Sequence, residues 1–136
     1  MSEVNTSVLV IDDESMVRHT VRFALEKLGY KITLAASGEE GLSLYREQAG
    51  RISLIVLDMS MPGMSGKEAL REIRNISLDV PVLITSGYSE DQVHDHFAGL
   101  KIAGFLQKPF TAKTLEATVG SVLSESDRQE STTRRQ

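Results

Sequence analysis

Five short runs of apolar residues recur along the chain, and each is followed by a segment with helical character. The runs are rich in valine, isoleucine and leucine, and they span Val8–Ile11, Ile32–Ala35, Ile52–Leu57, Val80–Thr85 and Ala103–Leu106. Apolar runs that do not alternate with polar residues are typical of strands buried on both faces of a parallel sheet. The second run lies in the segment KITLAA, which alternates more and is compatible with an edge strand.

Helical patterns fill the gaps between these runs. In the last segment one apolar face is formed by Leu115, Val119 and Val122. Gly29 is placed to end the first helix, and Thr111 to begin the last one. Five repeats of strand and helix favour right-handed crossovers, so the sequence predicts an α/β fold: a doubly wound five-stranded parallel sheet with helices on both faces.

Three of the expected helices begin with the spacing of a capping box, in which a serine and a Glu or Gln satisfy each other's backbone N–H. These starts are Ser37–Glu40, Ser65–Glu68 and Ser89–Gln92. The third opens a more polar helix with only Val93 and Phe97 to bury. We therefore expect that helix to be a mobile element.

Length and composition exclude several classes of protein. The chain has 136 residues, which fits one domain, and 15 basic against 19 acidic residues give a net charge of −4. No basic stripe is available to neutralise phosphates, so direct nucleic-acid binding is not expected. No apolar run approaches about 20 residues, so membrane insertion is not expected either. The absence of cysteine and of a signal-peptide pattern fits a cytoplasmic protein.

The ends of the chain are polar. We expect residues 1–6 to be an N-terminal extension, residues 7–123 to form the folded domain, and residues 124–136 to be a disordered tail. The tail, SESDRQESTTRRQ, contains no apolar residue that a core could bury.

Carboxylates follow two of the expected strands. Asp12 and Asp13 end the first strand, and Asp58 ends the third. If those strands are adjacent in a parallel sheet, the three groups converge, and two charges about 5 Å apart repel by roughly 3 kcal/mol at an effective dielectric near 20. A hard divalent cation such as Mg²⁺ offsets that repulsion, and a carboxylate can act as a nucleophile toward phosphorus. The alternative is structural: Asp12 or Asp13 caps a helix at Glu14, and Asp58 starts a turn.

The fourth and fifth strands contribute a hydroxyl and a cation to the same edge. Ser86 and Gly87 end the fourth strand, where a hydroxyl and an accessible N–H can donate to a phosphoryl oxygen. Lys108 ends the fifth strand and can pair with the carboxylates before a reaction and with a phosphoryl group after it. Pro109 permits a cis peptide bond that would aim Lys108 inward. Taken alone, Ser86 and Gly87 are a weak signal, because serine and glycine end many strands, and Lys108 alone is better explained as an ordinary lysine before a proline turn.

Four segments in this order resemble the receiver domain of two-component response regulators. They are VLVIDDE (Val8–Glu14), LIVLDMSMPGMSG (Leu54–Gly66), PVLITSGY (Pro81–Tyr88) and GFLQKPF (Gly104–Phe110). The resemblance runs from Ser7 to Leu123. It implies a flavodoxin-like strand order, 2-1-3-4-5.

The resemblance also implies roles for individual residues. Asp58 matches the phosphoacceptor, Asp13 the direct Mg²⁺ (or Mn²⁺) ligand and Asp12 its acidic neighbour, which acts largely through water, and the backbone carbonyl of Ser60 matches the third protein ligand. Lys108 matches the family's lysine. The switch residues are matched by Ser86, whose hydroxyl moves toward the phosphoryl group, and by Phe105, which turns inward with it. His19, His94 and His96 match no role and are expected to be solvated on helices.

The implied function is a signalling switch. A histidine kinase or phosphotransfer protein would donate a phosphoryl group from a phosphohistidine to Asp58, and the face of the fourth helix, fifth strand and fifth helix would change. The chain would not be an enzyme beyond its own phosphorylation and slow dephosphorylation. Ser60, Gly87 and Tyr88 should border the phosphoryl site, and we hypothesise that Tyr88 shields the phosphoryl group from water.

Two other functions share parts of this pattern. An aspartate-nucleophile phosphatase needs an acidic residue two positions after the nucleophile, where this chain has Ser60. A degenerate receiver could serve only as a protein-binding scaffold, but its site residues would not need to be intact. The pattern is compatible both with a stand-alone regulator and with a fragment of a hybrid histidine kinase.

Overall fold

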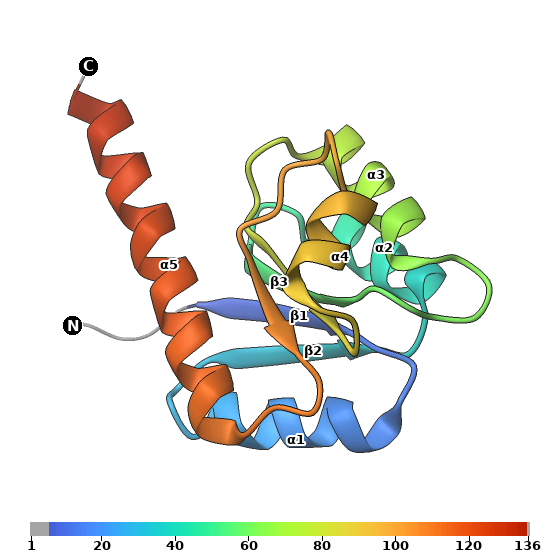
Figure 1. Ribbon diagram of the computed structural model, residues 1–136. Coiled ribbons are helices and arrows are strands. Elements are labelled where there is room, and N and C mark those ends of the chain that lie inside the picture. The colour runs from blue at the N-terminus through green and yellow to red at the C-terminus, as the bar shows by residue number, and fades with distance from the viewer. Residues whose placement is uncertain (1–5, 136) are drawn as a thin grey trace.

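The computed structural model describes residues 6–135, and the side chains of residues 6–127. Its centre is a sheet of five strands in the order β2-β1-β3-β4-β5, with every neighbouring pair parallel (Figure 1). The strands are β1 (Ser7–Ile11), β2 (Lys31–Ala35), β3 (Ile52–Asp58), β4 (Val82–Ser86) and β5 (Gly104–Gln107). The predicted fold and strand order are confirmed, and the more alternating strand β2 lies at an edge.

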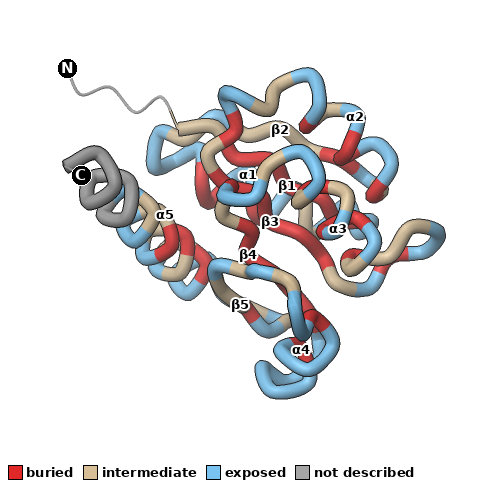
Figure 2. The backbone as a smooth tube through the Cα atoms, turned by 90° about the horizontal axis from the view of Figure 1, so that it is seen from above, coloured by how far each residue is buried: buried red, intermediate tan, exposed pale blue. Residues whose placement is uncertain are grey.

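Helices cover both faces of the sheet. On one face lie α1 (Ser15–Glu26) and α5 (Ala112–Arg135); on the other lie α2 (Gly38–Gln48), α3 (Gly66–Ile76) and α4 (Glu90–His96). Figure 2 shows the three central strands, β1, β3 and β4, as the buried centre of the molecule. Burying one leucine or isoleucine side chain here stabilises the fold by roughly 1.5 to 3 kcal/mol.

Alternate residues of each central strand enter different cores. In β3, Leu54 and Val56 pack with α1 and α5, whereas Ile55 and Leu57 pack with the opposite helices. This explains why the strands appear in the sequence as unbroken apolar runs rather than alternating ones. The burial also fixes the register, because a slip of one residue would exchange the two sets of side chains.

The predicted helix starts are found, with one difference in detail. Both halves of the capping box form at Ser65 and at Ser89. At the start of α2 the Ser37 hydroxyl accepts from the Glu40 N–H, but the Glu40 carboxylate accepts from the Ala36 N–H, one residue earlier than expected. Gly29 has a φ of 94° after α1, as a C-terminal glycine should.

The expected disordered tail is not what the structure shows. Helix α5 continues through most of residues 124–136 and ends at Arg135, while residue 136 and most of the expected N-terminal extension lie outside the described residues. Packing of Leu115, Val119 and Val122 fixes the first turns of the helix, and each further residue then adds a hydrogen bond without a new nucleation step. A polar segment that lacks glycine and proline can continue a helix in this way.

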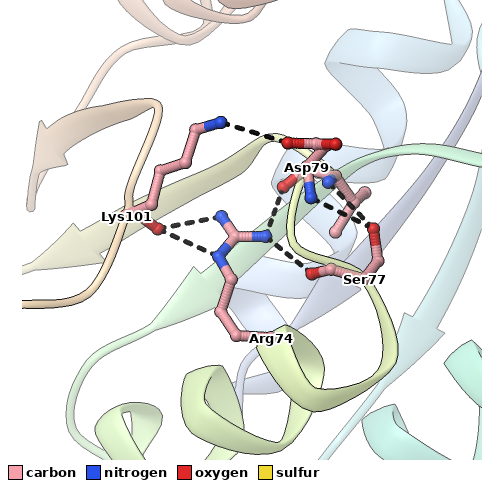
Figure 3. A network of polar contacts seen from close by, with 5 residues as sticks. Arg74, Ser77, Asp79 and Lys101 are labelled. Carbon is pink, nitrogen blue, oxygen red and sulfur yellow. Dashed lines mark hydrogen bonds and ion pairs between the residues drawn. The ribbon is translucent and has the colours of Figure 1, made fainter.

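Arg74 joins three segments at the amino end of the sheet. Its guanidinium group donates four hydrogen bonds, to the carbonyl oxygens of Ser77, Val80 and twice Lys101 (Figure 3). Lys101 in turn pairs with Asp79 at 3.4 Å. Because Arg74 is half-buried, desolvation lowers its pKa. The network ties the end of α3 to the segments that lead into β4 and β5.

The hydrogen bonds of Arg74 should contribute much more to the stability of the fold than the exposed ion pair between Lys101 and Asp79. Arg74→Met keeps the aliphatic stem but leaves partly buried carbonyl groups unpaired, so the free energy of unfolding should fall by about 2 kcal/mol in urea denaturation. Lys101→Met is the control, because it removes only an exposed pair and should change stability by less than about 1 kcal/mol. Equal losses in the two variants would contradict this assignment.

Among the described residues, no helix combines the length and apolar character needed to span a membrane.

Candidate functional site

Three carboxylates meet at the carboxyl edge of the sheet. Asp12 directly follows β1, and Asp58 is the last residue of β3. Because Ile11 is level with Leu57 in the pairing of these strands, Asp12 and Asp58 lie next to each other at the same edge of the sheet. Asp12 is 2% exposed and Asp58 is 3% exposed, whereas Asp13 is open to solvent. One oxygen atom from each of the three lies within 4.8 Å of the others. The structure therefore brings together the carboxylates that the strand order was expected to bring together.

The side chains of Asp12 and Asp13 do not cap α1. The N-cap residue of that helix is Glu14, and no side chain caps it. Asp12 Oδ1 accepts from the Glu14 N–H at 2.9 Å within the turn before the helix, and Asp58 Oδ1 accepts from the Ser60 N–H at 3.3 Å. Ser60 itself is exposed. The purely structural interpretation of Asp12 and Asp13 as side-chain caps of α1 is thus not supported.

Lys108 supplies the positive charge of the site. Its Nζ lies 3.0 Å from Asp12 Oδ2, 3.1 Å from Glu14 Oε1 and 3.4 Å from Asp58 Oδ1. Its backbone N–H donates to the Ser86 carbonyl at 2.8 Å, which fixes the end of β5 against β4. The Lys108–Pro109 peptide bond is cis, the form that the sequence permitted.

Two residues near the carboxylates were not identified from the sequence. Glu14 makes a direct ion pair with Lys108, and Arg18 donates to the Asp12 backbone carbonyl at 2.8 Å. Both residues follow Asp12 and Asp13 in the sequence: Glu14 directly precedes α1, and Arg18 lies in its first turn. Their side chains reach the site only because β1, α1 and β5 pack together, so local sequence gave no signal for either contact.

The end of β4 holds two buried hydroxyl groups of different kinds. The Ser86 hydroxyl accepts a hydrogen bond from the Tyr88 N–H at 2.9 Å. Thr85 is level with Asp58 in the strand pairing, and its buried hydroxyl has no hydrogen-bond partner among the described residues. Gly66 has a structural role nearby: a Cβ there would lie 2.5 Å from the Asp58 carbonyl oxygen, so only glycine lets α3 begin this close to β3.

The remaining predicted residues lie around this centre. Phe105 is partly buried and packs against the core on the α2–α4 face. Tyr88 is 51% exposed and lines a groove of about 690 Å³ with Ser60, Gln92 and His96. Gly87 stands in the exposed turn before Tyr88. His19, His94 and His96 are exposed on helices, as expected.

Burial and crowding shift the protonation of the acidic pair. Desolvation, followed by repulsion from Asp12, raises the pKa of Asp58 to about 7, although Lys108 opposes the shift. Desolvation also raises the pKa of Asp12. Desolvation alone would lower the pKa of Lys108, but its hydrogen bonds to Asp12 and Glu14 outweigh that effect and raise it. The site thus carries one firm ammonium charge and a carboxyl that titrates near neutral pH.

The donor set suits a hard divalent cation. Asp12, Asp13 and Asp58 offer only oxygen atoms, two of the groups are buried, and the excess negative charge is only partly offset by Lys108. Mg²⁺ and Mn²⁺ prefer this chemistry, with a few carboxylates and the rest of the shell left to water or phosphate oxygens.

The sequence model of one protein family, the response regulator receiver domain, matches residues 8–120 of this chain, and these include every residue of the site described above. The chain belongs to the receiver domain family. Receiver domains bind Mg²⁺ at an acidic pocket, interact with histidine kinases or phosphotransfer proteins, and act as signalling switches rather than, in general, as enzymes. The predicted family and fold are therefore confirmed.

Similar proteins occur both as kinases and as regulators. The receiver resembles the sensor kinase CckA of Brucella abortus, with 37% identity over 90% of this chain but only 13% of that protein. It is 36% identical to the probable transcriptional regulator ycf27 of Porphyra purpurea, over 94% of this chain and 51% of the relative. The chain thus spans about half or less of these curated relatives.

Solved structures agree with the fold. A response regulator receiver domain protein of Clostridium thermocellum is 31% identical, with a TM-score of 0.83 over 91% of this chain and 98% of that one. The chemotaxis protein CheY4 of Vibrio cholerae is 29% identical, with a TM-score of 0.76 over 88% and 99%.

The raised pKa of Asp58 predicts how stability depends on pH. The folded protein holds this proton up to about pH 7, whereas the unfolded chain releases it near the ordinary value of 3.8. Between these values the folded state binds more protons, so the free energy of unfolding falls as the pH rises through this window. Asp58→Asn should therefore be more stable than the wild type by about 1 to 3 kcal/mol at about pH 8, and by progressively less toward about pH 4.

The measurement is urea unfolding of both proteins across this range without divalent cations. Asp91→Asn is the control, because Asp91 is exposed on α4 and its variant should track the wild type. A stability difference for Asp58→Asn that does not change with pH would contradict the shifted pKa.

Proposed function

We propose that this receiver is a phosphoacceptor switch in which Asp58 receives a phosphoryl group from the phosphohistidine of a histidine kinase or phosphotransfer protein. The observation that carries the proposal is the placement of the buried Asp58 carboxylate 3.4 Å from Lys108 Nζ, beside Asp12 and Asp13. A carboxylate that serves only the fold would not need two further acidic groups within 4.8 Å of it.

In the proposed transfer, an Oδ atom of Asp58 forms a new P–O bond while the P–N bond to the partner's imidazole breaks, and the imidazole leaves. Lys108 stabilises the charge on the phosphoryl oxygens, because its ammonium group is already within reach of the Asp58 carboxylate. Asp12, Asp13, Asp58 and the Ser60 carbonyl are the proposed ligands of Mg²⁺ or Mn²⁺. When bound, the cation supplies positive charge that offsets the carboxylates and the phosphoryl oxygens.

The phosphoryl group would change the output face through Ser86. In the structure the Ser86 hydroxyl accepts from the Tyr88 N–H, and a phosphoryl oxygen on Asp58 offers it a new acceptor. Phe105 lies on the neighbouring strand β5 and is only partly buried, so in this proposal its ring turns inward when Ser86 moves. Helix α4 has seven residues and buries little beyond Val93, which suits an element that shifts on activation.

The partner kinase would approach along the start of α1. Met16 is 79% exposed in the first turn of that helix, beside the carboxylates, and Phe23 is 70% exposed about two turns further along it. Exposed apolar side chains next to a charged rim are typical of protein docking surfaces. We place the kinase on this face.

Similarity to both a sensor kinase and transcriptional regulators is compatible with a receiver attached to either kind of protein. We propose cytoplasmic action, with no catalysis beyond its own phosphorylation and slow dephosphorylation. The alternative, a receiver that serves as a scaffold without phosphorylation, predicts no dependence on Asp58.

Phosphorylation should depend on Asp58 and on a divalent cation. With Mg²⁺ and either a small phosphoramidate donor or a phosphorylated histidine kinase, the wild type should become labelled. The amount of label on Asp58→Asn should be lower by at least about a hundredfold. Beryllofluoride with Mg²⁺ should shift the NMR signals of Ser86 and Phe105 in the wild type and not in Asp58→Asn. Asp91→Asn is the matched control, and labelling that persists in Asp58→Asn would overturn the proposal.

Tyr88 should set the lifetime of the phosphoryl group. Its half-exposed ring borders the groove beside Ser60, so its removal should admit water and speed hydrolysis by about two- to tenfold. The test compares loss of label from phosphorylated Tyr88→Ala and Tyr88→Phe with the wild type. Because the phenylalanine ring still covers the site, that variant should stay close to the wild type. An unchanged lifetime in Tyr88→Ala would sink the shielding hypothesis.

A further inference from the structure

Glu14 occupies a helix position to which its side chain is poorly suited. It is the N-cap residue of α1, with extended backbone angles, yet its carboxylate accepts no hydrogen bond from the first turn. Serine, threonine, aspartate and asparagine are the residues that normally cap this position, because their short side chains reach the free N–H groups. A local rule broken without a local gain points to a contact elsewhere in the fold.

That contact is with Lys108, 94 positions further along the chain. Glu14 Oε1 lies 3.1 Å from Lys108 Nζ, as close as the buried Asp12 at 3.0 Å and closer than Asp58 at 3.4 Å. The Glu14 side chain is 60% exposed, whereas that of Lys108 is 18% exposed. An ion pair with one end in solvent contributes little to stability, so the contact is better explained by where it holds the ammonium group.

The three partners of Lys108 do not have the same duties. Asp12 and Asp58 belong to the acidic cluster that suits a divalent cation, and Glu14 does not. A cation bound by Asp12 and Asp58 would compete with the Lys108 ammonium for the same oxygen atoms and repel it. Glu14 is the partner that remains available to Lys108 when the other two turn to the cation.

We propose that Glu14 is a positioning residue that holds the Lys108 ammonium group beside the start of α1 and so lets a divalent cation bind to the cluster of Asp12, Asp13 and Asp58. The inference rests on the proposed function and adds to it the order in which Lys108 changes its ion-pair partners. Lys108 is shared before the cation binds, is held by Glu14 while the cation is bound, and moves to a phosphoryl oxygen once Asp58 is phosphorylated. Glu14 touches no reacting atom in this scheme.

The test measures Mg²⁺ binding to the unphosphorylated protein by calorimetry, which needs no phosphoryl donor. In Glu14→Gln the ammonium group stays on Asp12 and Asp58, so the dissociation constant should rise about three- to tenfold. Glu14→Asp keeps the charge but shortens the side chain by roughly 1.5 Å, which breaks the 3.1 Å contact, so it should behave like Glu14→Gln. Glu47→Gln, an exposed change on α2, should stay within about twofold of the wild type.

A double-mutant cycle isolates the contact from the loss of charge. In a Lys108→Met background no ammonium group competes with the cation, so adding Glu14→Gln should change the dissociation constant by less than about twofold. If Glu14→Asp binds Mg²⁺ like the wild type, or if the full effect of Glu14→Gln persists without Lys108, Glu14 acts only through its charge and the inference is overturned. No change in Glu14→Gln overturns it as well.

Failure of this inference can be told apart from failure of the proposed function. A wild type that binds Mg²⁺ and accepts a phosphoryl group, with Glu14 variants that bind the cation equally well, removes the role of Glu14 alone. A wild type that binds no Mg²⁺ at millimolar concentration removes the proposed function and this inference with it. Thermal unfolding of each variant confirms that a change in binding does not come from loss of the fold.

Discussion

The burial of two carboxylates, Asp12 and Asp58, at one edge of an apolar sheet is the constraint on which the rest of the site depends. Both groups are almost completely buried, and desolvation is the main reason that the pKa of each is raised. A buried charge without compensation is costly, so every other polar feature at this edge bears on how that cost is offset. Lys108 offsets it directly. The parallel register of β1 and β3 leaves the two groups no means of moving apart.

The two ends of the sheet are built for different purposes. At the amino end, Arg74 donates four hydrogen bonds that tie α3 to the segments leading into β4 and β5. At the carboxyl end of the same strands the backbone is also held, because the Ser86 carbonyl accepts from the Lys108 N–H, but the buried Thr85 hydroxyl has no partner among the described residues and the Ser86 hydroxyl accepts from a loop N–H. The side chains at this end can therefore change partners while the strands keep their register.

Much of this could be predicted from the sequence, because it depends on local pattern and on strand order. The apolar runs indicated buried parallel strands, and the residues after them, Asp12, Asp58, Ser86 and Lys108, had to meet at one edge. The continued helix to Arg135 was not predicted, because a polar composition alone does not distinguish a disordered tail from the solvated extension of an already anchored helix.

The contacts that were missed share a physical cause. Glu14 and Arg18 make their important bonds to Lys108 and to the Asp12 carbonyl, and Arg74 bonds to carbonyl groups on two other segments. Long charged side chains reach across several ångströms, and their partners depend on how helices pack rather than on residue spacing. In the sequence each of these residues looks like an ordinary charged residue on a helix surface.

The charges at the carboxyl edge explain why one phosphoryl group could have a large effect. Four carboxylates, those of Asp12, Asp13, Glu14 and Asp58, face one ammonium group, and a pKa of about 7 means that Asp58 is partly protonated near neutral pH. A proton and Lys108 therefore compete for the same two buried carboxylates. In the proposed function a divalent cation would join this competition, and an anion on Asp58 that binds the cation and Lys108 together would select one arrangement of the site.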